Sequence, residues 1–89
     1  MSYSVEFSED AVKQIKKLDE YTRRMVYNWL YKHLEGTDDP YSSGHALTRS
    51  LKGLWRYRIG DYRLIAKIEK GRLVILVLVI GRRSRIYDR

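Results

Sequence analysis

Residues 51–89 decide the fold, and they read LKGLWRYRIGDYRLIAKIEKGRLVILVLVIGRRSRIYDR. Residues 54–59 are expected to form a strand, in which apolar and polar side chains alternate from Trp55 to Ile59. Gly60 with Asp61 follows where a tight hairpin turn belongs, so the chain is expected to return as a second strand over residues 62–69. After a Lys-Gly turn, residues 73–80 contain no polar side chain. Such a run is typical of a central strand that is covered on both faces.

A strand and two helices are expected to precede this sheet. Residues 3–7 alternate as a half-buried strand does, and Ser8 is a candidate N-cap followed by two acidic residues that suit a helix N-terminus. A first short helix follows, and a break at residues 19–21 separates it from a second helix that ends near Glu35. The side chains predicted on the buried side of the second helix are Val26, Trp29, Leu30, His33 and Leu34.

The element order predicts an α+β fold, β-α-α-β-β-β. The two helices are joined by a short link and should form an antiparallel hairpin that packs on one face of a small antiparallel or mixed sheet. Residues 36–50 are rich in turn-forming residues and read as a long loop, which indicates a functional or partner-binding segment. Residues 1–89 are expected to form a single domain.

Composition narrows the function classes. The chain has no cysteine, which excludes disulfides and thiolate metal sites. Its start lacks the pattern of a signal peptide, and residues 73–80 fall far short of the roughly 20 residues of a membrane helix, so a cytoplasmic protein without membrane contact is expected. Neither His33 nor His45 stands at ligand spacing from a carboxylate, and there is no glycine-rich phosphate loop, so neither a metal nor a cofactor is predicted.

Positive charge is concentrated in the C-terminal half. The net charge is +7, and residues 51–89 hold eleven arginines and lysines against three acidic residues. This asymmetry indicates a polyanionic partner. The helical half is close to neutral, so direct DNA binding by this chain alone through a helix-turn-helix is not expected.

Arginines and tyrosines give this charge a pattern. Arg56 and Arg58 share one face of a strand, because strand side chains alternate, and Arg63 follows the hairpin turn. Converging guanidinium groups bind phosphate oxygens and stabilise charge that develops on phosphorus, although any exposed sheet face is also polar. Further cations expected to contact RNA are Lys52, Arg82 and Arg85, and tyrosines able to stack on unpaired bases are Tyr57, Tyr62 and Tyr87.

The motifs LKGLWRYR at 51–58, GDYRL at 60–64 and GRR with IY at 81–87 resemble the RelE/ParE toxin superfamily, and its RelE branch most. The resemblance implies a compact sheet with two N-terminal helices and a ribosome-dependent endoribonuclease that cuts messenger RNA and is restrained by a RelB-like antitoxin. It further implies that Arg63 contacts the scissile phosphate, that Arg83 stabilises charge or protonates the leaving group, and that Tyr87 stacks on a base. Arg56 and Arg58 stand where well-known members carry lysines, and they join the expected catalytic set.

The implied reaction is attack of a ribose 2′-hydroxyl on the adjacent phosphate, without a metal. Its proton acceptor stays open, because arginine has a pKa above about 12 and is a poor base. Lys52, His45 and Tyr87 are alternatives, as is a reaction that relies on positioning by the ribosome. Two other functions also stay open: a ParE-like, non-enzymatic inhibitor of DNA gyrase, and a basic RNA-binding module without catalysis. The arginine cluster with Tyr87 favours RNA cleavage.

Overall fold

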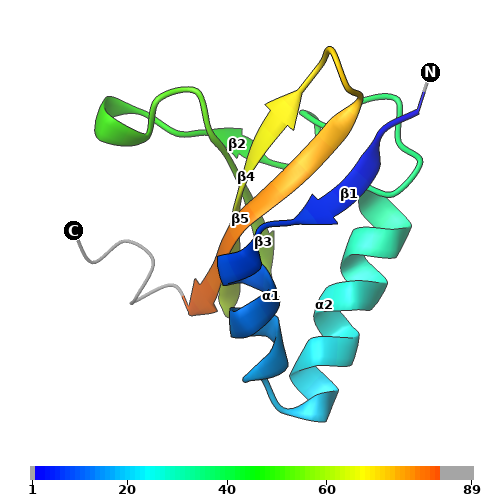
Figure 1. The fold of residues 1–89 in the computed structure, drawn as a ribbon, viewed down its shortest axis with the longest axis vertical. Coiled ribbons are helices and arrows are strands. Elements are labelled where there is room, and N and C mark those ends of the chain that lie inside the picture. Colours follow the sequence, from blue (N-terminus) through cyan, green and yellow to red (C-terminus); the bar gives the residue numbers. More distant parts are fainter. Residues whose placement is uncertain (1, 83–89) are drawn as a thin grey trace.

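The computed structural model describes residues 2–82, so the predicted site residues Arg83, Arg85 and Tyr87 lie outside the described part of the chain. Figure 1 shows how the elements are arranged. In chain order they are β1 (Ser4–Phe7), α1 (Glu9–Lys16), α2 (Glu20–His33), β2 (His45–Ala46), a 3-10 turn η1 (Arg49–Leu51), β3 (Trp55–Ile59), β4 (Tyr62–Glu69) and β5 (Val74–Arg82).

The strands form one mixed sheet in the order β1-β5-β4-β3-β2. β1 runs parallel to β5, and the other neighbours are antiparallel, which confirms the predicted α+β class and the hairpin at Gly60. The structure adds one short strand, β2, to the predicted element order. A two-residue strand is too short to show alternation, and β2 exists because the loop folds back on β3, where Leu47 N–H also donates to Leu54 O at 3.0 Å.

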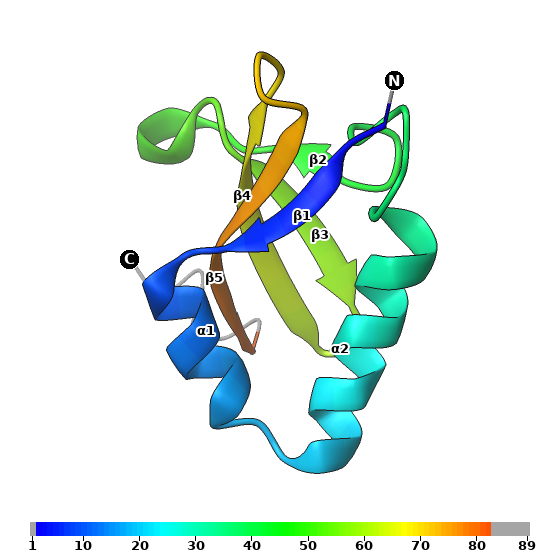
Figure 2. The same ribbon diagram turned by 45° about the vertical axis from the view of Figure 1, so that its right-hand side comes forward.

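Both helices lie on the same side of the sheet, as Figure 2 shows. The apolar stripe of α2 consists of Val26, Leu30 and the C-cap Leu34, which pack with buried sheet residues such as Tyr57 and Leu64. Each such side chain contributes roughly 1.5–3 kcal/mol when it leaves water. The hydrophobic core thus lies between the helices and the sheet face that they cover. Packing on this side fixes the strands that carry the residues of the opposite face.

His33 was expected on the buried side of α2, and that prediction was wrong. The side chain is exposed, and its ring stacks on Trp29 with 4.5 Å between ring centroids. The i, i+4 stripe of α2 passes through residues 26, 30 and 34, so residue 33 falls beside the stripe at the rim of the core.

Two side chains fix where the helices begin. Ser8 is the N-cap of α1, where its Oγ accepts from Ala11 N–H at 3.1 Å and donates to Leu78 O at 3.0 Å. Asp19 caps α2 by accepting from Thr22, and these hydrogen bonds lower the pKa of the Asp19 carboxyl. The second helix therefore starts at Glu20, within the predicted break.

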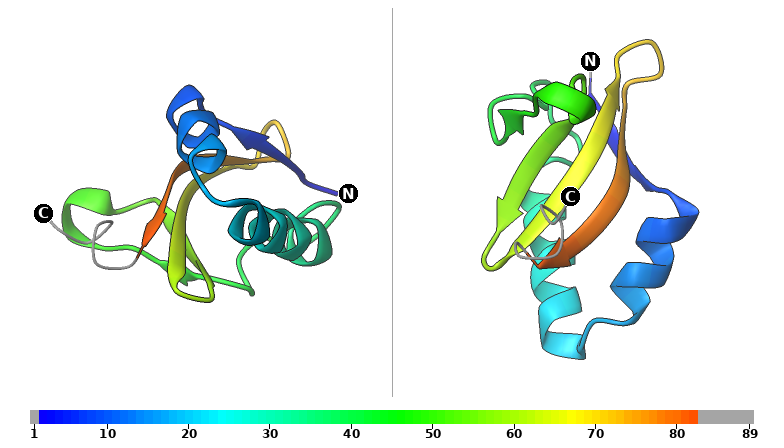
Figure 3. Two further views of the ribbon diagram at one scale, coloured as in Figure 1. Left: turned by 90° about the horizontal axis from the view of Figure 1, so that it is seen from below. Right: turned by 90° about the vertical axis from the view of Figure 1, so that its left-hand side faces the viewer.

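β5 is an interior strand, with β1 on one side and β4 on the other, whereas the middle position that was predicted for it belongs to β4. The expected coverage of β5 on both faces is only partly met: Ile75 and Val77 are buried, whereas Leu76 and Val79 are half-buried. Leu76 and Val79 are paired with Lys67 and Ile65, on the sheet face opposite the helices. Figure 3 (right) views the sheet from that face, and no α-helix of the described residues covers it. Among residues 2–82 there is also no helix with the length and apolar character needed to cross a bilayer.

Candidate nucleic-acid interface

Three of the predicted site arginines share the sheet face opposite the helices. Arg58 is paired with Arg63, and Arg63 is paired in turn with Gly81 of β5. One step further along the strands, Arg56 is paired with Ile65. Directly paired residues of antiparallel strands point to the same side, so the three arginine side chains leave the sheet on one face. We call this set, Arg56, Arg58 and Arg63, the arginine face.

The buried residues of β3 dictate which way the arginines point. Tyr57 and Ile59 are buried toward the helices, so Arg56 and Arg58 must project to the other side. The Tyr57 hydroxyl donates to Pro40 O, and Trp55 Nε1 donates to Tyr41 O at 3.1 Å. These two bonds hold the loop against β3, next to the residues where β2 pairs with β3.

Tyr57 was one of the tyrosines considered for stacking on RNA bases, and the structure makes it a core residue instead. Its side chain has no exposed surface, and Trp29 packs beside its ring at 5.9 Å between centroids. Burial raises the pKa of the Tyr57 hydroxyl well above the usual value for tyrosine. The residue therefore stays a neutral hydrogen-bond donor inside the core.

Arg63 is more enclosed than the sequence suggested, because only 6% of its surface is exposed. Its Nη1 donates to Tyr62 O at 3.1 Å and to Gly60 O at 3.4 Å, so the guanidinium closes the hairpin turn. Gly60 has a φ of +59°, a conformation that glycine adopts at little cost. A guanidinium carries five N–H donors, and these two bonds engage only one of its nitrogens.

Two predicted RNA contacts lie apart from the arginine face. Arg82 is paired with Tyr62 and shares the helix side of the sheet, where its guanidinium lies 5.5 Å from the centre of the Tyr62 ring. Both residues, with Lys17, line a hollow of about 600 Å³ at the end of β5. Lys52 is exposed at the C-cap of η1, outside the sheet. These cations would meet an RNA strand only where it continues beyond the arginine face.

His45 is the residue that sequence reasoning left undecided and the fold brings to the site. It lies in β2 directly opposite Arg56, so its side chain emerges on the arginine face, and it is exposed. The sequence did not predict this position, because no local pattern in the loop shows which of its residues pair with β3.

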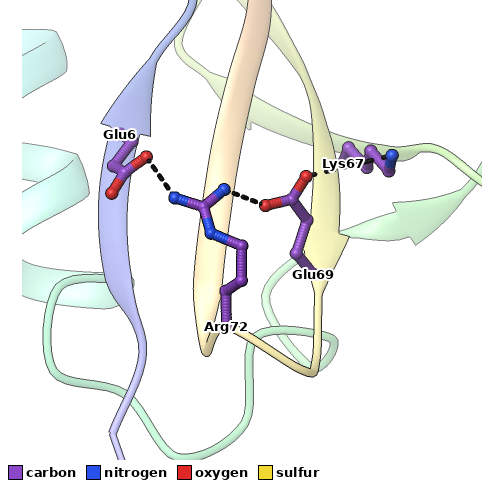
Figure 4. A network of polar contacts seen from close by, with 4 residues as sticks. All are labelled: Glu6, Lys67, Glu69 and Arg72. Carbon is purple, nitrogen blue, oxygen red and sulfur yellow. Dashed lines mark hydrogen bonds and ion pairs between the residues drawn. The ribbon is translucent and has the colours of Figure 1, made fainter.

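A network of ion pairs, drawn in Figure 4, occupies the other end of the same face. Arg72 bridges β1 and the end of β4 by pairing with Glu6 at 3.2 Å and with Glu69. Lys67 approaches the second Glu69 oxygen at 3.9 Å. Glu6 and Glu69 thus lie next to Arg72 and Lys67, away from the arginine face. The positive charges at this end of the sheet are paired with carboxylates.

Comparisons with known proteins agree with this fold. The family model described as the ParE toxin of the type II toxin-antitoxin system, parDE, matches residues 5–87. The RelG toxin of Mycobacterium tuberculosis (strain ATCC 25618 / H37Rv) is 29% identical over 89 residues, which is 100% of both chains.

Two solved structures are also similar. One is the toxin-antitoxin complex RelBE2 of Mycobacterium tuberculosis, with a TM-score of 0.84, 26% identity and 94% of each chain covered. The other is the archaeal RelE-RelB complex of Pyrococcus horikoshii OT3, with a TM-score of 0.70, 28% identity and coverage of 96% of this chain and 99% of that chain. The chain belongs to the RelE/ParE toxin family. It is thus a toxin of a type II toxin-antitoxin system, and the relatives that it resembles include proteins named RelG and RelE toxins.

Proposed function

We propose that this toxin is a ribosome-dependent endoribonuclease that cleaves messenger RNA. The observation that carries the proposal is the arginine face: Arg56, Arg58 and Arg63 leave neighbouring strands on one side of the sheet, over which no described α-helix lies. Guanidinium groups in this arrangement suit a phosphodiester better than a protein surface, because each can donate two parallel hydrogen bonds to phosphate oxygens.

The reaction is transfer of the phosphoryl group from the 5′-oxygen of one nucleotide to the 2′-oxygen of the preceding ribose. The 2′-oxygen loses its proton and bonds to phosphorus, the bond to the 5′-oxygen breaks, and that oxygen takes up a proton. The products are a 2′,3′-cyclic phosphate and a 5′-hydroxyl, and no metal is required. Negative charge grows on the phosphate oxygens, and donors already aimed at that position lower the barrier.

Each predicted residue has a place in this scheme. Arg56 and Arg58 bind the phosphate oxygens, while Arg63 joins them through the nitrogens that do not close the hairpin turn. Arg83 stabilises the developing charge or protonates the leaving oxygen, and Tyr87 stacks on a base and orients the substrate. The remaining cations bind flanking RNA or ribosomal RNA: Lys52, Arg82 and Arg85.

The partner that restrains the toxin is proposed to be a RelB-like antitoxin. Relatives of this chain were crystallised in RelBE and RelE-RelB complexes. A chain of net charge +7 suits an acidic, partly disordered segment that folds as it wraps the toxin. Residues 1–89 would act as one domain in the cytoplasm, where translating ribosomes supply the substrate.

The test is primer extension on a translated message, with and without the purified toxin. New RNA ends at codon positions, which require ribosomes and vanish when antitoxin is added, are the expected result. An Arg83→Ala variant should bind ribosomes but leave the message intact. A wild-type toxin that yields no new ends on translated messages would overturn the proposal.

The second candidate is inhibition of DNA gyrase without enzymatic activity, because the family model that matches residues 5–87 is described as the ParE toxin. A supercoiling assay separates the two functions. Loss of supercoiling by purified gyrase, with messages left intact, would favour the second candidate.

A further inference from the structure

His45 extends the arginine face across one more strand. Along one row of the sheet, Val79 of β5 is paired with Ile65 of β4, Ile65 with Arg56 of β3, and Arg56 with His45 of β2. The neighbouring row contains Gly81, Arg63 and Arg58. His45 is therefore the outermost residue of the row that contains Arg56. The row that contains Arg58 and Arg63 lies next to it on the same face.

The spacing of a sheet sets the distances within this cluster. Strands lie about 4.8 Å apart and residues rise about 3.3 Å along each strand, so the Cα atom of His45 lies about 8 Å from that of Arg58 and about 12 Å from that of Arg63. Long side chains that leave the same sheet face can contact one shared ligand over such distances. A phosphodiester held above Arg56 and Arg58 would bring its ribose next to the imidazole.

Without His45, the arginine face has no side chain that can accept a proton. Guanidinium groups donate hydrogen bonds but do not accept a proton near neutral pH. Imidazole is the side chain that exchanges protons there. The charged groups that face His45 are Arg56 and Arg58 from β3, with Arg63 and Lys67 further away on β4. Among the other candidates, Lys52 lies on the turn after η1 rather than on the sheet face.

We propose that His45 accepts the proton of the attacking ribose 2′-hydroxyl. This role rests on the endoribonuclease function proposed above. The lone pair of an imidazole nitrogen takes the proton, the 2′-oxygen bonds to phosphorus, and the bond to the 5′-oxygen breaks with its electron pair on that oxygen, which is protonated by water. The imidazolium returns its proton to solvent after the products leave.

The experiment measures single-turnover cleavage of ribosome-bound messenger RNA by full-length toxin between pH 5.5 and 8.5. His45→Ala and His45→Gln are the variants, and His33→Ala is the matched control. His33 is also exposed but lies on α2, on the other side of the sheet. Antitoxin binding and the thermal unfolding midpoint are measured for all four proteins, and both should be unchanged by the two substitutions of His45, which is exposed on an edge strand.

The expected result is a loss of about 10²- to 10⁴-fold in the cleavage rate of both His45 variants, which is the usual contribution of a positioned proton acceptor. The rate of the wild-type toxin and of His33→Ala should rise with pH across the acidic part of this range, because only a neutral imidazole can accept a proton, whereas the residual rate of His45→Ala should not. Added free imidazole should accelerate His45→Ala and leave His45→Gln unchanged, because only the smaller side chain leaves space for it.

Three outcomes would overturn the role. Equal cleavage by wild-type toxin and His45→Ala would remove His45 from the reaction while leaving the proposed function intact. A slow His45→Ala that keeps the wild-type pH profile and is not accelerated by imidazole would make the residue a positioning group only. Absence of cleavage by the wild-type toxin would overturn the proposed function and this role together.

Discussion

Gly44 sits where the long loop approaches β3 most closely, and Gly44→Ala is the substitution with the clearest expected cost. A Cβ atom at residue 44 would lie 2.5 Å from Arg56 O, 2.8 Å from Trp55 Cδ1 and 2.8 Å from Tyr57 Cδ1. None of these atoms is the free end of a flexible side chain. Tyr57 is held by Pro40 and by the core, and Trp55 is held by its bond to Tyr41.

The structure sets the size of the effect. Carbon atoms are comfortable at about 3.5–4.0 Å, so the loop must retreat from β3 by about 1 Å. Overpacking of this kind costs about 1–3 kcal/mol. Because His45 is the next residue, the retreat also displaces the proposed proton acceptor, and a shift of about 1 Å at a reacting group can slow catalysis by about 10²-fold.

Urea unfolding followed by tryptophan fluorescence measures the stability change, with Gly71→Ala as the matched control. Gly71 has no atom within 4 Å of an added Cβ and no left-handed φ, so its replacement should leave the unfolding midpoint unchanged. Gly44→Ala should lower the midpoint by roughly 1 M, given a urea dependence of about 1–3 kcal/mol per molar. Identical midpoints for Gly44→Ala and the wild-type toxin would refute the close approach of the loop to β3.

Three further predictions concern the bonds that position the site. Tyr57→Phe leaves Pro40 O without its buried donor and should lower the free energy of unfolding by about 1–3 kcal/mol in urea titrations, whereas an unchanged value would mean that water replaces the hydroxyl. Burial raises the pKa of the Tyr57 hydroxyl, so its contribution to the free energy of unfolding is complete below about pH 10, the pKa of an unfolded tyrosine. This contribution is lost as the pH rises further. The wild-type toxin should therefore lose more stability than Tyr57→Phe between pH 9 and 11. Ser8→Ala removes the cap of α1 and the bond to Leu78 O, and it should lower the free energy of unfolding by about 1–2 kcal/mol in thermal unfolding. Ser42→Ala, at an exposed position, is the control. Equal effects of the two substitutions would exclude a special role for the cap.

Much of the fold could be predicted because its strands carry patterns that fit only one arrangement. The alternation around Arg56 and Arg58, the turn at Gly60 and the apolar run of β5 each specify a strand and its place in the sheet. Alternation also predicted correctly that Arg56 and Arg58 share a face. In each case the information lies within a few consecutive residues.

The remainder depended on contacts between distant segments. β2 pairs with β3 because of bonds from Tyr57 and Trp55 to the loop, and no local pattern in the loop announces them. Arg63 is a different case, because its bonds to the hairpin carbonyls Gly60 O and Tyr62 O are local, whereas the family resemblance implied only a phosphate contact. His45 therefore joins the site through register rather than through any motif.

The most direct test of the central claim compares the two ends of the same sheet face. Arg58→Ala and Arg72→Ala each remove one exposed arginine, the first from the arginine face and the second from the ion pairs with Glu6 and Glu69. In single-turnover cleavage of ribosome-bound messenger RNA, Arg58→Ala should lose about 10²-fold or more in rate, as the loss of one aligned donor does, while Arg72→Ala should cleave at the wild-type rate. Equal rates for the two variants would contradict the claim that the arginine face holds the scissile phosphate.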